Sequence, residues 1–231
     1  VTATDIAGNT GSNSVTITED STPNTLIIST PAQTLNADNI TITGSTKANS
    51  SISIAGGVVT ATGTADGAGL YSLVVGLTQD ANNNLTVTST DIVNNVLTGS
   101  VLIVEDSTNP VTVISTPAQT TYNPIITLSG TTEALATVVV TGGSGTTQTV
   151  ADGSGVWTLP VDLTLSSLNT LVATATDLAG NSGSASVQIT HDSVPVFLTL
   201  SVPDQTIHAA TFTFTGNTKS GATVTITSLS G

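Results

Sequence analysis

The sequence predicts an all-β protein built from tandem β-sandwich repeats of 86 residues. Two observations favour this fold class: residues recur at one fixed interval, and short β-branched runs alternate with turn-rich gaps without a helical period. The positions that recur every 86 residues include Asp5, Asp91 and Asp177; Asp20, Asp106 and Asp192; Pro31, Pro117 and Pro203; and Gly44, Gly130 and Gly216. A period without insertions indicates one structural unit copied in tandem, so function should belong to the array and its junctions.

The recurring aspartates divide the chain into four segments. We expect residues 1–20 to be the C-terminal end of a preceding repeat and residues 193–231 to be the N-terminal half of a following repeat. Two full repeats, residues 21–106 and 107–192, lie between them. The end segments do not add up to one repeat, because the counterpart of residues 60–86 is missing. We therefore expect the chain to be part of a longer protein.

Each full repeat contains seven short β-type runs. Seven short strands in fewer than about a hundred residues predict a two-sheet sandwich. In the second repeat the expected strands, A to G in order, are Val111–Thr116, Ile125–Gly130, Ala136–Gly142, Thr146–Ala151, Val156–Val161, Asn169–Thr176 and Ser184–Thr190.

The sixth of these runs predicts which side chains face the core. Successive strand residues point to opposite faces, so Leu171, Ala173 and Ala175 share one side. Trp157, in the fifth run, occupies the same position as Tyr71 one period earlier. A large ring at a strand centre is typical of a packing anchor, so we assign both rings to the core.

Composition excludes several classes of partner. Only 7% of the residues are charged, yet the net charge is −13, with two lysines and no arginine. Nucleic acid binding needs clustered Lys and Arg, and an anionic membrane surface attracts the same residues. No apolar run approaches the roughly 20 residues of a membrane helix. The sequence therefore predicts neither nucleic acid binding nor membrane insertion.

Cysteine and methionine are both absent from the chain. Disulfides cannot stabilise the repeats, and two oxidisable side chains are missing, which is compatible with an extracellular location. No phosphate loop, nucleophile elbow or paired general acid and base occurs in the sequence. We therefore expect a protein that is not an enzyme.

Three sequence stretches carry a resemblance to a known family. They are the strand and loop VATATDLAGNSGSASVQI, the loop ADGSGVWTLPV and the linker EDSTNPVTVISTP. Together they resemble the tandem bacterial immunoglobulin-like (Ig-like) repeats of large secreted surface adhesins, including biofilm-associated proteins and the extender regions of RTX-type adhesins. The resemblance covers the whole chain and implies a linear, rod-like stalk at the bacterial cell surface, often stiffened by Ca²⁺ at the junctions.

Acidic residues should gather at one end of each sandwich. The start of strand A shares that end with the loops that follow strands B, D and F. We therefore expect Asp106, Asp152 and Asp177 to converge, with Glu133 and Asn181 in reach, and the corresponding set Asp20, Asp66, Asp91 and Asn95 to converge one repeat earlier. Clustered carboxylates repel one another, and Ca²⁺ takes oxygen ligands in flexible geometry. The sequence therefore predicts calcium at the junctions.

Turn formation is the alternative explanation of the same residues. Asp before Gly is a common turn signal, and Asp near Pro in a linker can cap a turn. The position of Glu133 holds Lys47 one repeat earlier and Lys219 one repeat later. A lysine there can neutralise the acidic group, so the first junction is the weaker calcium candidate.

The sequence is compatible with three functions. The first is a structural extender that holds an adhesive element away from the cell surface, for adhesion or biofilm formation, with neighbouring repeats of the same chain as partners. The second is an extracellular fibre or sheath whose repeats associate laterally or end to end through exposed strand edges. The third is a recognition module that binds through loops, ranked last because those loops hold no aromatic cluster.

Overall fold

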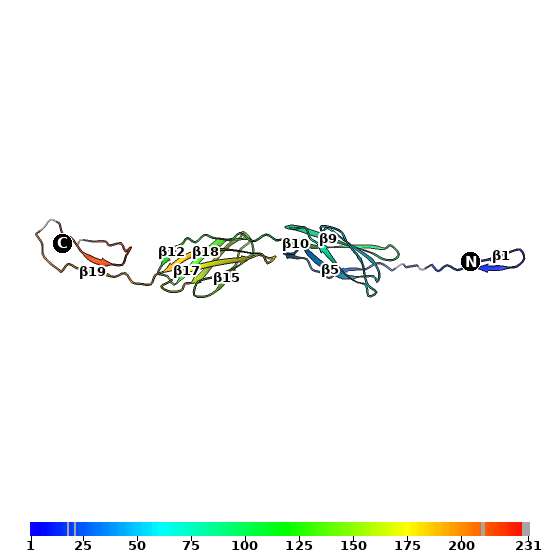
Figure 1. Ribbon diagram of the computed structural model, residues 1–231, viewed down its shortest axis with the longest axis horizontal. Helices are drawn as coiled ribbons and strands as arrows, with labels where there is room; N and C mark the ends of the chain where they lie inside the picture. Colours follow the sequence, from blue (N-terminus) through cyan, green and yellow to red (C-terminus); the bar gives the residue numbers. More distant parts are fainter. Residues whose placement is uncertain (18, 21, 209–210, 228–231) are drawn as a thin grey trace. The chain divides into compact units, whose positions relative to one another are not determined.

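The computed structural model describes residues 1–17, 19–20, 22–208 and 211–227 (Figure 1). The chain forms two compact units: the first contains Val1–Asn109 and Asp177–Asn181, and the second contains Pro110–Thr176 and Ser182–Gly231. Ser21, where the first full repeat was predicted to begin, lies outside the described residues. No helix occurs in the described ranges, so none is long and apolar enough to cross a membrane there.

The first unit contains a complete sandwich and a small hairpin. The larger sheet has the order β4-β10-β9-β6-β7, the smaller sheet has the order β3-β5-β8, and β1 pairs with β2. The strands are β1 Thr2–Thr4, β2 Thr10–Ser12, β3 Leu26–Ile28, β4 Gln33–Leu35, β5 Asn39–Thr46, β6 Ser51–Ala55, β7 Ala61–Thr64, β8 Leu70–Gly76, β9 Ala81–Thr90 and β10 Val96–Glu105.

The second unit repeats this arrangement in the same order. Its sheets have the orders β12-β18-β17-β14-β15 and β11-β13-β16, and β19 pairs with β20. The strands are β11 Val113–Ile114, β12 Gln119–Thr121, β13 Ile125–Thr131, β14 Thr137–Thr141, β15 Thr147–Val150, β16 Val156–Asp162, β17 Leu168–Thr176, β18 Ser182–His191, β19 Leu198–Leu200 and β20 Gly216–Thr218. The predicted strands B to G correspond to β13 to β18, with ends shifted by up to two residues.

The prediction for strand A was wrong in extent, because two short strands replace one run. β11 pairs antiparallel with β13 in the smaller sheet, whereas β12 pairs parallel with β18 in the larger one. Pro117 lies between them and has no N–H to donate to a ladder, so the strand is interrupted there and the chain crosses to the other sheet. Pro31 stands at the same place between β3 and β4. The recurring proline therefore marks the crossing.

Each sandwich encloses one hydrophobic core between its two sheets. Leu171, Ala173 and Ala175 are fully buried, which confirms the predicted core face of β17. Trp157 and Tyr71 are also buried, as predicted. The first core consists of Ile42, Ile52, Ile54, Ala65, Tyr71, Val75, Leu77, Leu85, Val87, Val101 and Ile103. The second consists of Leu128, Ala136, Val138, Val140, Ala151, Trp157, Leu159, Val161, Leu163, Leu171, Ala173, Ala175 and Ile189.

The recurring strand glycine makes room for the core aromatic ring. Gly130 of β13 is paired with Trp157 of β16, and Gly44 of β5 is paired with Tyr71 of β8. A Cβ atom on Gly130 would lie 2.0 Å from the Val113 carbonyl oxygen and 2.5 Å from the indole ring. Only glycine fits between the edge strand and the ring, which explains why this position keeps the period.

The recurring aspartates form one kind of turn. Oδ1 of Asp91 accepts hydrogen bonds from the backbone N–H groups of Val93 and Asn95, and Oδ2 accepts one from the side chain of Asn95. Asp177 makes the corresponding bonds with Ala179 and Asn181. The residue before each asparagine has a positive φ, 69° at Asn94 and 96° at Gly180, which Gly and Asn tolerate best. Local turn geometry therefore accounts for the spacing of Asp and Asn.

Asp91 is held in its charged form. Burial acts to raise its pKa, but hydrogen bonds from Asn95, Val93 and Lys47 outweigh burial and lower the pKa to about 2. The lysine ammonium lies 3.3 Å from Oδ2. Because the pKa in the folded state is depressed, this carboxylate stabilises the fold above its ordinary pKa of 3.8, and the contribution is lost as pH falls toward about 2.

We predict that Gly130→Ala destabilises the second sandwich by about 1–3 kcal/mol, the usual range for overpacking a core. The new methyl group must displace a backbone carbonyl or the Trp157 ring. Urea unfolding followed by fluorescence measures the effect, because Trp157 is the one tryptophan of the chain. Gly145→Ala is the control, since its Cβ meets no atom within 4 Å. Equal unfolding midpoints for the two variants would contradict the steric explanation.

For Asp91 we predict an acid-dependent stability difference between the wild type and Asp91→Asn. The wild type is more stable near neutral pH, and its advantage shrinks between about pH 4 and about pH 2, where the carboxylate becomes protonated. Urea midpoints at several pH values, read from the amide NMR signals of β9, measure the difference. A gap that stays constant down to pH 2 would show that the charge of Asp91 does not stabilise the fold.

Candidate metal centre

Two of the three equivalent linker aspartates form an ion pair with a lysine. In the first unit, Nζ of Lys47 bonds to Oδ2 of Asp20 as well as approaching Asp91. In the second unit, Nζ of Lys219 lies 2.5 Å from Oδ2 of Asp192. The lysine hydrogen bond lowers the pKa of both linker aspartates, and the bond to Asp20 raises the pKa of Lys47. These linkers therefore carry a compensated negative charge.

The linker at Asp106 differs in one residue. Glu133 takes the sequence position of Lys47 and Lys219, and those two lysines are the only ones in the chain. Glu133 belongs to the second unit, in the turn between β13 and β14, where its carbonyl oxygen accepts a hydrogen bond from the Ala136 N–H. A carboxylate therefore replaces the ammonium that accompanies the other two linker aspartates.

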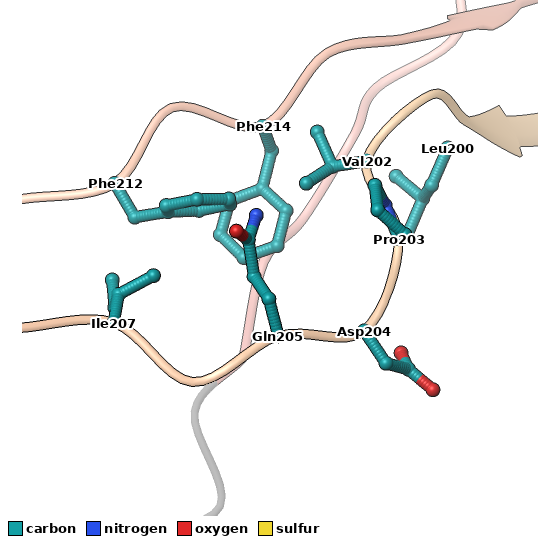
Figure 2. Close-up of a pocket in the computed structure, with 8 residues that line it drawn as sticks. All are labelled: Leu200, Val202, Pro203, Asp204, Gln205, Ile207, Phe212 and Phe214. Carbon is teal, nitrogen blue, oxygen red and sulfur yellow. The ribbon is translucent and has the colours of Figure 1, made fainter.

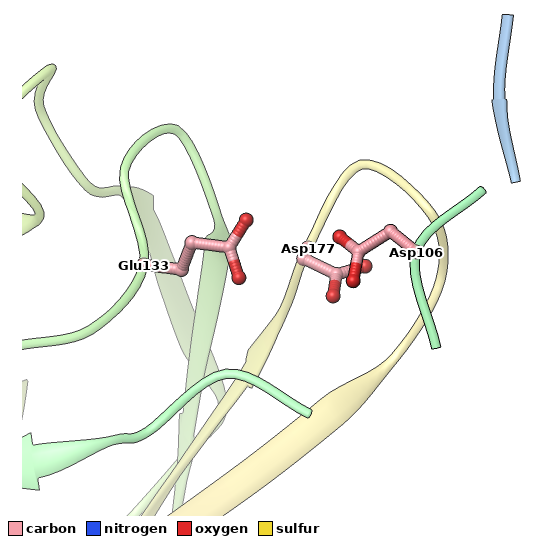
Figure 3. Close-up of side chains that lie close together, drawn as sticks. All are labelled: Asp106, Glu133 and Asp177. Atoms are coloured by element: carbon pink, nitrogen blue, oxygen red, sulfur yellow. The ribbon is translucent and has the colours of Figure 1, made fainter. Parts of the chain in front are cut away.

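Asp106 and Asp177 bring two carboxylates together within the first unit. One oxygen of each lies within 4.8 Å of the other. Figure 3 draws this pair and also Glu133 of the second unit. Oδ1 of Asp177 accepts three backbone hydrogen bonds, from residues 179, 180 and 181, whereas among the described residues Oδ2 accepts one bond, from the Asn181 amide. A carboxylate oxygen offers two lone pairs, so Oδ2 keeps one for a cation.

The linker around Asp106 is held by hydrogen bonds that its residues donate to Asp80, just before β9, and to Asp106 itself. Oδ1 of Asp80 accepts bonds from the N–H and hydroxyl groups of Ser107 and from the hydroxyl of Thr108. These bonds lower the pKa of Asp80. Oδ1 of Asp106 accepts the Thr108 N–H at 3.1 Å, and within the described part of the chain its Oδ2 makes no hydrogen bond. The Asp106 carboxylate is therefore fixed in place while one oxygen stays available.

Asn181 joins the same group. Its side-chain amide donates to the Asp106 carbonyl oxygen at 2.8 Å and to Oδ2 of Asp177 at 2.9 Å. Its Oδ1 accepts a hydrogen bond from the side chain of Asn36 at 2.5 Å. The sequence carries no periodic signal for Asn36, because its counterpart one period later is Tyr122.

The other predicted ligands lie in turns of their own sandwiches. Asp66 lies in the segment between β7 and β8, and Asp152 lies in the segment between β15 and β16. In each, Oδ1 accepts backbone N–H bonds from the residues two and four positions later. Asp20 and Asp91 share Lys47, and Asn95 bonds to Asp91. The first repeat therefore places a lysine among its acidic residues, as the sequence suggested.

The donor set around Asp106 suits calcium better than the other common divalent metals. Carboxylate oxygens of Asp106 and Asp177 are hard ligands, and Ca²⁺ binds six to eight oxygens in flexible geometry. Zinc prefers His or Cys, and the group contains neither.

A hollow of about 300 Å³ near the C-terminal end has a different character (Figure 2). Its lining is mainly apolar and includes an edge-to-face pair of rings, Phe212 and Phe214, with centroids 5.2 Å apart. Phe214 is 51% exposed, whereas its counterpart one period earlier, Leu128, is fully buried in the second core. The hollow offers a single carboxylate, Asp204, which points away from the rings.

The chain is similar in fold to several solved multidomain proteins. A 1.5-MDa bacterial ice-binding adhesin is 20% identical over 74% of this chain and 65% of that one, with a TM-score of 0.41. A Ca²⁺-stabilised adhesin with which an Antarctic bacterium binds ice is 20% identical over 86% and 58%, with a TM-score of 0.38. An I-band fragment of titin is 12% identical over 74% and 66%, with a TM-score of 0.53. The chain therefore spans less than two thirds of the length of these adhesin structures.

The family is established by the sequence itself. No curated protein matches the chain. Residues 29–106 and 115–192, which together make up more than half of the chain, each match the family described as the bacterial Ig domain. These ranges contain the strands from β4 to β10 and from β12 to β18, and the first range ends at the linker residue Asp106. The chain belongs to the bacterial Ig domain family, of which it contains two tandem copies.

Proposed function

We propose that this chain is part of the extender, or stalk, of a large bacterial adhesin, located extracellularly at the cell surface and serving adhesion or biofilm formation. Its role is structural rather than catalytic, and its partners are neighbouring repeats of the same chain. The observation that carries this proposal is that the residues shared by the repeats have structural roles. The recurring residues form cores, strand crossings and turns, as in Gly130, Pro117 and Asp177. A stalk needs identical, self-contained units and no unique pocket.

We further propose that calcium stiffens the linker at Asp106. The proposed ligands are Asp106 and Asp177, and Glu133 supplies a third carboxylate. Asn181 bonds to both aspartates and orients them. Asp152, in the turn between β15 and β16, is a further proposed ligand. The proximity of the Asp106 and Asp177 oxygens supports this, as does the available oxygen on each. Replacement of the position-equivalent lysine by Glu133 supports it further, because Lys47 and Lys219 pair with Asp20 and Asp192 rather than with Asp106. The set at Asp20, Asp66, Asp91 and Asn95 is the weaker calcium candidate, since Lys47 already pairs with Asp20 and Asp91.

We predict that Glu133→Lys abolishes the calcium response of the chain. In the wild type, calcium at about 100 times its Kd should stabilise the fold by about 2.7 kcal/mol, and a chelator should remove this gain. The variant gives the second linker the charge pattern of the first, so calcium should change neither its melting temperature nor its X-ray scattering. Calorimetric titration of the whole chain with CaCl₂ measures binding directly.

Asp162→Lys is the matched control for this experiment. It changes the net charge by the same amount on an exposed residue of the second sandwich. The control should keep the wild-type calcium response. If the wild type binds no calcium, or if Glu133→Lys and Asp162→Lys respond alike, the proposed calcium site is wrong.

A further inference from the structure

The side chain of Asn181 is bonded more fully than a turn requires. It is 5% exposed, and both its donors and its acceptor are used. The turn itself uses only the bond to Oδ2 of Asp177, as in the equivalent turns, where Asn9 bonds to Asp5 and Asn95 bonds to Asp91. The bonds to the Asp106 carbonyl and from Asn36 are additional. Of the asparagines in the three equivalent turns, Asn181 is the one whose side chain makes these two additional bonds in the described part of the chain.

The partners of Asn181 are presented by the parallel pairing of β4 and β10. Glu105, the last residue of β10, is in register with Leu35, the last residue of β4. The Asp106 N–H continues this ladder by donating to the Leu35 carbonyl at 3.1 Å. Asn36 and the Asp106 carbonyl therefore emerge side by side from two paired strands. We call this pair of groups the amide seat.

We propose that the amide seat is a docking surface for an Asp-x-x-x-Asn turn of a following repeat, and that it fastens this turn without a metal ion. The turn 177–181 is grouped with the first unit, whereas the strands that flank it, β17 and β18, belong to the second. A turn fixed on the seat is therefore a tether between consecutive repeats. An asparagine suits this role because its amide donates and accepts at once.

The seat and the proposed calcium site use different atoms. The seat offers a backbone carbonyl and the Asn36 side chain to the Asn181 amide, whereas calcium would bind carboxylate oxygens. The inference deepens the proposed stalk function, since both devices restrict the same linker. Only the tether should survive in a chelator.

Distance measurements between spin labels test the tether. The chain has no cysteine, so Thr62→Cys and Gln148→Cys, which are exposed and one period apart, place one label on each sandwich of the whole chain. All measurements are made in excess chelator. Asn36→Ala and Asn181→Ala should widen the distance distribution, since the loss of one hydrogen bond raises the undocked population about three- to tenfold. Asn36→Asp should do the same, because it sets an acceptor against the acceptor Oδ1 of Asn181.

Asn95→Ala is the matched control, because it removes the same turn bond from a turn without a seat. It should leave the distribution unchanged, and the fluorescence of Trp157 should report an intact second sandwich in every variant. If the distances between the spin labels are as narrowly distributed in Asn36→Ala and Asn36→Asp as in the wild type, the proposed docking on the amide seat is wrong. Calcium titration of Asn36→Ala separates the two proposals, because it should bind calcium as the wild type does.

Discussion

The structure of each repeat depends on closing a hydrophobic core between two sheets of unequal size. Strand A of each sandwich contributes to both sheets, as β3 and β4 in the first unit and as β11 and β12 in the second. It can do so because a proline, which has no N–H group, interrupts it where the chain crosses between the sheets. An aromatic ring then fills the centre of the core, and the strand beside it carries a glycine where any side chain would collide with the ring. These constraints act together, so all three positions recur with the period.

The acidic residues are best understood first as turn formers. Asp91 and Asp177 each accept several backbone N–H bonds, which replace the water that a carboxylate loses on burial. Their recurrence therefore needs no metal. The feature that turns do not explain is the charge at one position, where Glu133 replaces Lys47 and Lys219. That exchange leaves the second linker with carboxylates and without a lysine partner.

The linkers of this chain thus differ although the sandwiches are alike. Lys47 and Lys219 pair with linker aspartates, whereas at Asp106 the structure places a second carboxylate and a fully bonded amide instead. These lysine pairs remain partly open to solvent, and solvent-exposed ion pairs contribute little to stability, typically about 0–1 kcal/mol, and are screened by salt. Directional hydrogen bonds or a bound cation would restrict a linker more strongly. Variation at a few linker positions can therefore set stiffness without changing the fold.

The sequence by itself determined the period, the strands from β13 to β18, the buried rings of Trp157 and Tyr71, and the lysine among the acids of the first repeat. These depend on side-chain alternation, turn chemistry and charge, which act over a few residues or repeat with the period. Only the tertiary structure decided that strand A divides between two sheets and that Asn36 meets Asn181, 145 positions later. The first depends on which strands pair within each sheet, and the second joins two segments far apart in the sequence; Asn36 has no periodic counterpart that could have marked it.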